Sequence, residues 1–167
     1  MRRNNVQPSS EAGVTADLSR FIKLVSEGAA GPYAFVQLLG MQTVEWPKIV
    51  SAVNRGLPYR TLEHLRQNTG LPESVVFRWI QLAPRTADRR KREGRLEPEE
   101  SDRLLRAARV FGKALELFEG NRDYATEWLS SAQPALGGAM PLQVSESEVG
   151  AREVEDLLGR LEHGVYS

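Results

Sequence analysis

Residues 98–118, PEESDRLLRAARVFGKALELF, form the longest stretch of the chain with a continuous helical period. Pro98 suits the first helical position, and the acidic residues that follow it complement the positive end of a helix. The apolar residues form two stripes along this predicted helix: Leu104, Ala108, Phe111, Leu115 and Phe118 on one, and Ala107, Val110, Ala114 and Leu117 on the other. A helix that is apolar over so much of its circumference is buried on two sides.

The second buried side of this helix has two candidate partners. One stripe packs in the protein's own core, and the other meets either a second subunit or the neighbouring part of the chain. We favour the second subunit and expect a homodimer, with an interface formed by Leu104, Ala107, Val110, Phe111 and Ala114.

The other segments also have a helical period, so the sequence predicts an all-α fold. From Thr15 to Glu27 apolar residues recur at helical spacing, with Thr15 as the N-cap. The type of the apolar run 33–41 stays open. Further helices are expected at about 46–55, 59–68, 73–81 and 84–93, after Asn121, and from Ser145, where Glu148 completes a capping box. The expected core includes Ile49, Val50, Val53 and the three tryptophans Trp46, Trp79 and Trp128.

Charge is divided unevenly along the 167 residues, although the formal net charge is zero. Residues 1–95 carry 15 Lys and Arg against 8 Asp and Glu, whereas residues 96–167 carry 7 against 14. Such asymmetry indicates a basic face for nucleic acid and an acidic face for protein, unless the two halves simply attract each other. Without cysteine, a secretory h-region or an apolar run of membrane-spanning length, we expect a cytoplasmic protein with no membrane partner.

The run RTADRRKREGR, residues 85–95, is the candidate DNA reader. On a helix, Arg85, Arg89 and Arg92 share one face, which suits contacts to phosphates or guanine edges in a major groove. Arg90 belongs to the same basic run. The preceding segment packs through Val76, Ile80 and Leu82, so 73–81 and 84–93 together resemble a helix-turn-helix.

A competing register places the turn at Gly70-Leu71 and the reading helix at 73–81. It has a turn glycine, whereas the first register has Gln81 there. The outward residues of this competing helix carry little positive charge for DNA, so we prefer the first register. These outward residues are Glu73, Ser74, Phe77, Arg78 and Gln81. A solvated basic face that pairs with the acidic half remains the alternative to both.

No catalytic constellation is present in the sequence. His64 and His163 are far apart and lack partners at metal-ligand spacing. Gly137-Gly138 follows no strand, so it is no phosphate loop. We therefore expect a protein that is not an enzyme and has no metal or cofactor.

From about Gly70 onward, the chain resembles the Xre/MbcA/ParS-type antitoxins of bacterial toxin–antitoxin modules. The matching pieces occur in order over roughly the last hundred residues, which makes the resemblance specific. They are 84–86 (PRT), 89–96 (RRKREGRL), 98–104 (PEESDRL), 109–110 (RV), 128–129 (WL), 134–138 (PALGG), 141–142 (PL), 150–160 (GAREVEDLLGR) and 163–166 (HGVY).

The resemblance implies an antitoxin whose usual partner is a RES-domain toxin that degrades NAD. Its C-terminal region would cover the toxin's active site, and its helix-turn-helix would bind operator DNA and repress its own operon. The implied organisation is a disordered lead (1–14), an Xre-like helix-turn-helix domain (15–96) and a dimerisation and toxin-binding domain (97–167). The resemblance also adds Thr86 to the DNA-binding set, while Ala87 and Asp88 depart from the family pattern.

The acidic, aromatic C-terminal stretch suits the role of a plug. A cleft that binds NAD phosphates is expected to carry positive groups, which could meet acidic side chains and a terminal carboxylate. Tyr166 could then fill an apolar slot as an anchor, or Val165 and Tyr166 could fold back onto their own helix. The expected toxin-binding residues are Glu153, Asp156, Arg160, His163, Gly164, Val165, Tyr166 and Ser167.

Two other readings remain open: a stand-alone helix-turn-helix transcription regulator, and an interaction protein whose helix-turn-helix no longer reads DNA.

Overall fold

A computed structural model describes residues 15–164, and these residues are helical with no strand, as expected. An isolated β-bridge joins Pro58 to Arg95. The elements in chain order are α1 (Ala16–Ser26), η1 (Ala34–Leu39), α2 (Trp46–Asn54), α3 (Arg60–Thr69), α4 (Glu73–Trp79), α5 (Pro84–Glu93), α6 (Pro98–Leu117), α7 (Arg122–Leu129), η2 (Pro134–Leu136), α8 (Pro141–Val144) and α9 (Glu148–Glu162).

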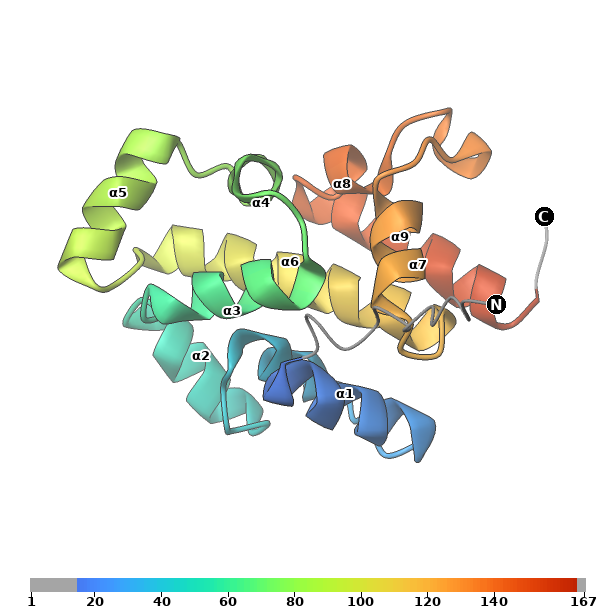
Figure 1. Cartoon of the computed structure of the whole chain (residues 1–167), viewed down its shortest axis with the longest axis horizontal. Helices are drawn as coiled ribbons and strands as arrows, with labels where there is room; N and C mark the ends of the chain where they lie inside the picture. Colours follow the sequence, from blue (N-terminus) through green and yellow to red (C-terminus); the bar gives the residue numbers. More distant parts are fainter. Residues whose placement is uncertain (1–14, 165–167) are drawn as a thin grey trace, which may run out of the picture.

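The helix α6 is the centre of the fold. It runs along the long axis of the molecule, with α1 and α2 on one side and α4, α5 and α8 on the other (Figure 1). It packs against η1, α2, α3, α7 and α9. Gly112 allows a close approach to η1, since a β-carbon there would lie 2.9 Å from Cβ of Phe35. The run 33–41, whose type the sequence left open, thus contains a short 3₁₀ helix that covers α6.

The predicted dimer interface needs correction. Leu104, Ala107, Val110, Phe111 and Ala114 are each at most 2% exposed in the single chain. Both apolar stripes of α6 are covered by other helices of the same chain, so these five side chains present no surface to a second copy.

Helix α2 differs from its prediction on one face. Ile49 and Val53 point into the core as expected, whereas Trp46 is 59% exposed and Val50 is also exposed. Trp79 is buried, and Trp128 is partly buried and packs against the core.

The last helix begins two residues later than predicted. Ser147, not Ser145, is the N-cap, and its hydroxyl accepts a hydrogen bond from the Gly150 amide. Ser145 lies buried after α8, where its hydroxyl donates to the Pro141 carbonyl and accepts from the Trp79 indole at 2.8 Å. The capping box observed at α6 joins Glu97 and Glu100 instead.

A buried ion pair joins α5 to α6. Arg90 donates to Glu100 through Nε at 2.8 Å and through Nη2 at 3.0 Å, and it also donates to Glu93 at 3.0 Å. Arg90 is therefore not available to DNA, which corrects its prediction as a reading residue. Burial alone would raise the pKa of Glu100, but hydrogen bonds from Arg90 and the Glu97 amide outweigh it and lower that pKa below its ordinary value.

We predict that Glu100→Gln destabilises the protein by about 2 kcal/mol at neutral pH, because it leaves a buried guanidinium without its best partner. A carboxyl whose folded pKa is lowered stabilises the fold above its ordinary pKa, and this contribution is lost as the pH falls through the folded value. The gap between wild type and variant, measured by urea unfolding at several pH values, should thus close in acid. Glu93→Gln is the control, since Glu93 is more exposed and should matter less. A gap that is independent of pH would contradict the role of the carboxylate.

The packing of α8 on α9 yields a second prediction. A β-carbon on Gly150 would lie 1.7 Å from the Val144 carbonyl oxygen, whereas one on Gly159 of the same helix would meet nothing within 4 Å. Gly150→Ala should therefore cost about 3 kcal/mol through overpacking. Gly159→Ala should instead stabilise the helix by about 0.5–1 kcal/mol. Thermal unfolding of both variants tests this pair, and similar melting temperatures would contradict it.

Candidate functional site

Helix α5 carries the basic face predicted from the sequence. Pro84 starts the helix, and Gly94 ends it in a left-handed conformation at φ 77°. Ala87 is buried and orients the helix, so Arg85, Arg89 and Arg92 are exposed and Thr86 is half-buried. Helix α5, which carries these residues, lies at one end of the long axis of the molecule (Figure 1). Of the predicted set, Arg90 alone is buried.

The turn of each candidate helix-turn-helix contains a residue with positive φ. Gly70 ends α3 at φ 67°, and Gln81 lies between α4 and α5 at φ 52°, a conformation that favours glycine. On α4, Phe77 is buried, contrary to its prediction as outward, and Arg78 is an exposed cation. Of the two helices, α5 presents more positive charge to solvent, so the choice of α5 as the reading helix stays our prediction.

Helix α9 forms the second candidate surface. Its inner stripe, Val154, Leu157 and Leu158, is buried against the core. The predicted partner-binding residues Glu153, Asp156, Arg160, His163 and Gly164 are all exposed. A shallow hollow beside this face is lined by Asp156, Arg160, His163 and Lys113. Val165, Tyr166 and Ser167 lie outside the described residues.

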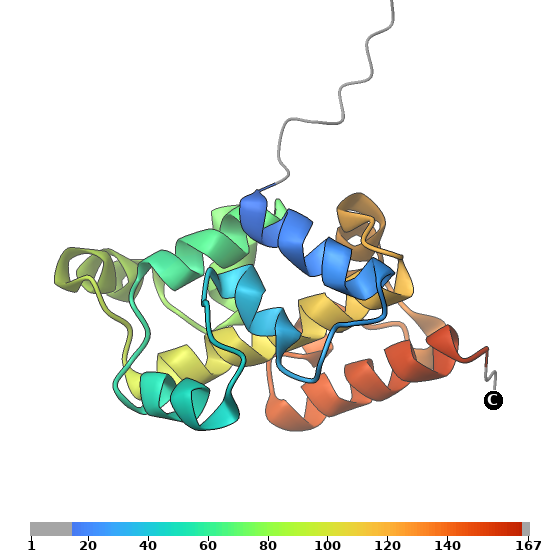
Figure 2. The ribbon, with the colours of Figure 1, turned by 90° about the horizontal axis from the view of Figure 1, so that it is seen from below.

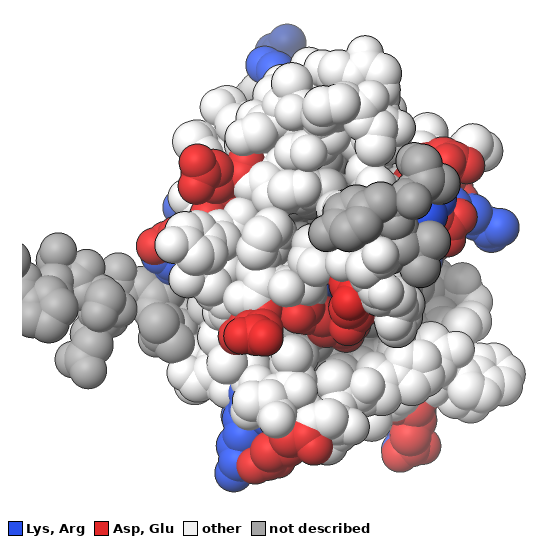
Figure 3. All heavy atoms as spheres, turned by 90° about the vertical axis from the view of Figure 1, so that its right-hand side faces the viewer, with Lys and Arg blue, Asp and Glu red and all other residues white. Residues whose placement is uncertain are grey.

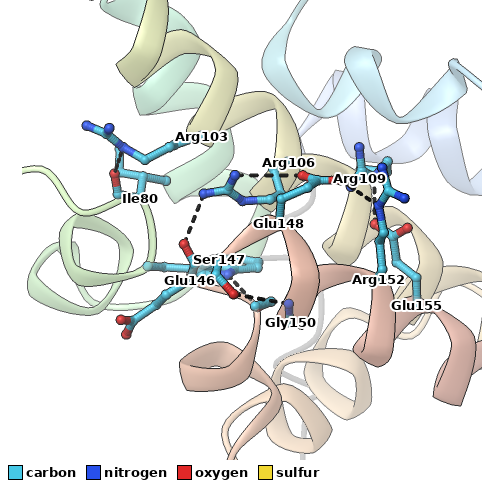
Figure 4. A network of polar contacts seen from close by, with 12 residues as sticks. Ile80, Arg103, Arg106, Arg109, Glu146, Ser147, Glu148, Gly150, Arg152 and Glu155 are labelled. Atoms are coloured by element: carbon cyan, nitrogen blue, oxygen red, sulfur yellow. Dashed lines mark hydrogen bonds and ion pairs between the residues drawn. The ribbon is translucent and has the colours of Figure 1, made fainter.

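Arginines of α6 hold α9 in place, and sequence reasoning missed them (Figure 4). Arg106 donates to the Glu146 carbonyl at 2.9 Å, directly before α9. Arg109 donates to Glu148 at 3.0 Å and to Glu155 at 2.6 Å. Burial alone would raise the pKa of Glu148, but Arg109 and other cations lower it below its ordinary value.

The same arginine face also reaches the other half of the molecule. Arg103 donates from Nε to the Ile80 carbonyl at 2.7 Å, just after α4 (Figure 4). Positions 103, 106 and 109 are three residues apart, and this spacing was the available signal. One polar face of α6 therefore fixes both the end of α4 and the start of α9.

Within residues 15–164, no group of three His, Cys, Asp or Glu side chains is placed to hold a metal ion. His64 lies 2.6 Å from Asp17, between α3 and α1.

None of the helices described here is long and apolar enough to cross a membrane.

Comparison with known proteins identifies both parts of the chain. Residues 48–109 match the family model of the antitoxin Xre-like helix-turn-helix domain, and residues 113–164 match that of the antitoxin Xre/MbcA/ParS C-terminal toxin-binding domain.

Several curated relatives match most of the chain. Antitoxin Xre of Yersinia enterocolitica is 34% identical, over 77% of this chain and 88% of its own. Antitoxin Xre of Photorhabdus laumondii is 29% identical over the same shares. A Sphingobium protein named Prs ADP-ribosylating antitoxin is 25% identical, over 81% of this chain and 89% of its own. These relatives are antitoxins, in agreement with the prediction that the protein is not an enzyme, and the chain belongs to the Xre family of antitoxins.

Proposed function

We propose that the protein neutralises a RES-domain toxin that degrades NAD, by covering the toxin's active site with its C-terminal region. The observation that carries this proposal is the outer face of α9. Its charged residues are exposed, its inner stripe is buried, and it lies within the segment that matches the toxin-binding domain. A relative is named Prs ADP-ribosylating antitoxin, and ADP-ribosylation consumes NAD, which supports a toxin of this chemistry.

The charge of this face suits the proposed partner. A pocket for NAD binds two phosphates, so it is expected to offer guanidinium groups or backbone donors. Glu153 and Asp156 are exposed carboxylates on α9 and could reach such groups when the antitoxin docks. In this proposal Val165, Tyr166 and Ser167 enter the cleft.

We further propose that the protein represses its own operon in the cytoplasm, as a homodimer on operator DNA. Arg85, Arg89 and Arg92 support this proposal because they are exposed on one helix. The homodimer requires a surface other than the five buried residues of α6. The division into 1–14, 15–96 and 97–167 also stays a proposal, and the family matches meet inside α6, between residues 109 and 113.

Reversing the charge of α9 tests the neutralisation. Glu153→Lys with Asp156→Lys should weaken binding to the co-expressed toxin by about a hundredfold, because like charges then face each other. Glu127→Lys, an exposed change on α7, is the control and should bind as wild type does. Co-purification, NAD consumption and growth report the result. Wild-type protein that fails to bind the product of the neighbouring toxin gene, while still binding DNA, would favour a stand-alone transcription regulator.

Deleting Val165 to Ser167 tests the plug separately. We expect the shortened protein to bind the toxin less tightly and to leave measurable NAD consumption, since an anchoring side chain contributes much of the binding energy of an interface. Full protection of cells by the shortened protein would rule out the plug but not the contact of α9.

DNA binding has its own test. Arg85→Ala with Arg89→Ala should reduce the slope of log affinity against log salt by about 2, because each lost phosphate contact removes about one released counterion. Arg78→Ala on α4 is the matched comparison. If it changes sequence preference while the double variant binds normally, α4 is the reading helix. Promoter binding that does not depend on salt would leave an interaction protein without a DNA reader.

A further inference from the structure

An open hollow lies at the end of the molecule opposite α5. The ends of α1, α6 and α9 converge there (Figure 2) and border a volume of about 890 Å³ that is open to solvent. Four apolar residues form part of its walls: Val25, Ala30, Leu117 and Leu161. Three glutamates also line it: Glu116, Glu119 and Glu162.

The carboxylates of the hollow are short of positive charge. Glu116 has Lys113 as a partner at 3.6 Å, yet burial and the nearby Glu162 raise the pKa of Glu116 above its ordinary value. Glu119 and Glu162 form no ion pair with any other residue between 15 and 164. Acidic side chains are visible on this end of the molecule in Figure 3. The hollow is therefore complementary to a cation.

Glu119 has an unfavourable backbone conformation. Its φ is 53°, in the left-handed region that L-residues with side chains seldom adopt. The next residue, Gly120, packs so tightly that a β-carbon there would lie 2.8 Å from Cγ2 of Ile22 in α1. The turn after α6 is thus fixed against α1, and a glycine at position 119 would fit its backbone better than glutamate does.

The hollow gives a role to the N-terminal part of the chain. Residues 16–39 lie outside both family matches, yet Val25 and Ala30 form one of its walls. The glutamates, Leu117 and Leu161 belong to the segment that matches the toxin-binding domain. Its position beside the end of α9 makes it continuous with the proposed toxin-binding face, and its negative charge opposes contact with nucleic acid.

We propose that this hollow receives a cationic segment of the partner toxin: a Lys or Arg side chain whose aliphatic stem lies against the apolar walls and whose charged end meets Glu119 and Glu162. Long basic side chains bury their stems and keep their heads at polar groups in this way. Charge-assisted hydrogen bonds to carboxylates then fix the position of the segment. This inference rests on the proposed toxin neutralisation and extends its contact surface to α1.

The test separates folding from binding. Glu119→Gly relieves the left-handed glutamate, so it should raise the melting temperature while weakening toxin binding by about tenfold, through loss of one charge-assisted contact. Glu162→Gln should weaken binding by a similar factor with an unchanged melting temperature. Glu127→Gln, an exposed glutamate on α7, is the control for loss of a surface charge. Calorimetric titration of the purified toxin at two salt concentrations gives the affinities, and both hollow variants should show a weaker dependence on salt.

A more stable Glu119→Gly protein that binds the toxin as tightly as wild type would overturn the inference and leave the neutralisation intact. Equal weakening by Glu127→Gln would also overturn it, because the effect would then reflect net charge alone. If Glu119→Gly lowers the melting temperature instead, the toxin affinity of Glu162→Gln alone tests the inference, and an affinity equal to wild type would overturn it. Wild-type protein that binds no toxin would refute the proposed function itself, and this inference with it.

Discussion

The burial of α6 on nearly all sides is the constraint on which the rest of the structure depends. A helix of 20 residues with two apolar stripes must be covered by other elements, and η1, α7 and α9 cover it from parts of the chain far apart in sequence. One polar face of the helix carries Arg103, Arg106 and Arg109, which bind the end of α4 and the start of α9. One helix therefore supplies the core and also orients both candidate surfaces.

Local signals predicted the helices well because caps and helix breakers act over a few residues. Thr15 and Pro98 mark helix starts where the sequence predicted them, and α5 ends at Glu93 as expected. The covering of the second stripe of α6 depends on contacts between distant segments, which periodicity does not contain. The prediction of a dimer interface there failed for this reason. Ser145 shows the same limit. Its spacing to Glu148 resembled a capping box, but its buried hydroxyl accepts a hydrogen bond from the Trp79 indole instead.

The candidate surfaces were predictable to the extent that they lie on one helix. The spacing of Arg85, Arg89 and Arg92 placed them on one exposed face. Helical spacing likewise predicted that the charged residues of α9 are exposed. Arg90 could not be excluded in advance, because its partner Glu100 belongs to the next helix and approaches only in the folded chain. The hollow was invisible in the sequence, since Val25, Glu119 and Glu162 come from three separate segments.

The position of the family boundary inside α6 has a consequence for turnover in the cell. Because this helix is shared, the part that matches the helix-turn-helix and the part that matches the toxin-binding domain enclose one core and have no independent cores of their own. Global unfolding therefore exposes both parts to a protease at the same time. The amount of folded chain thus sets the amount of both parts together.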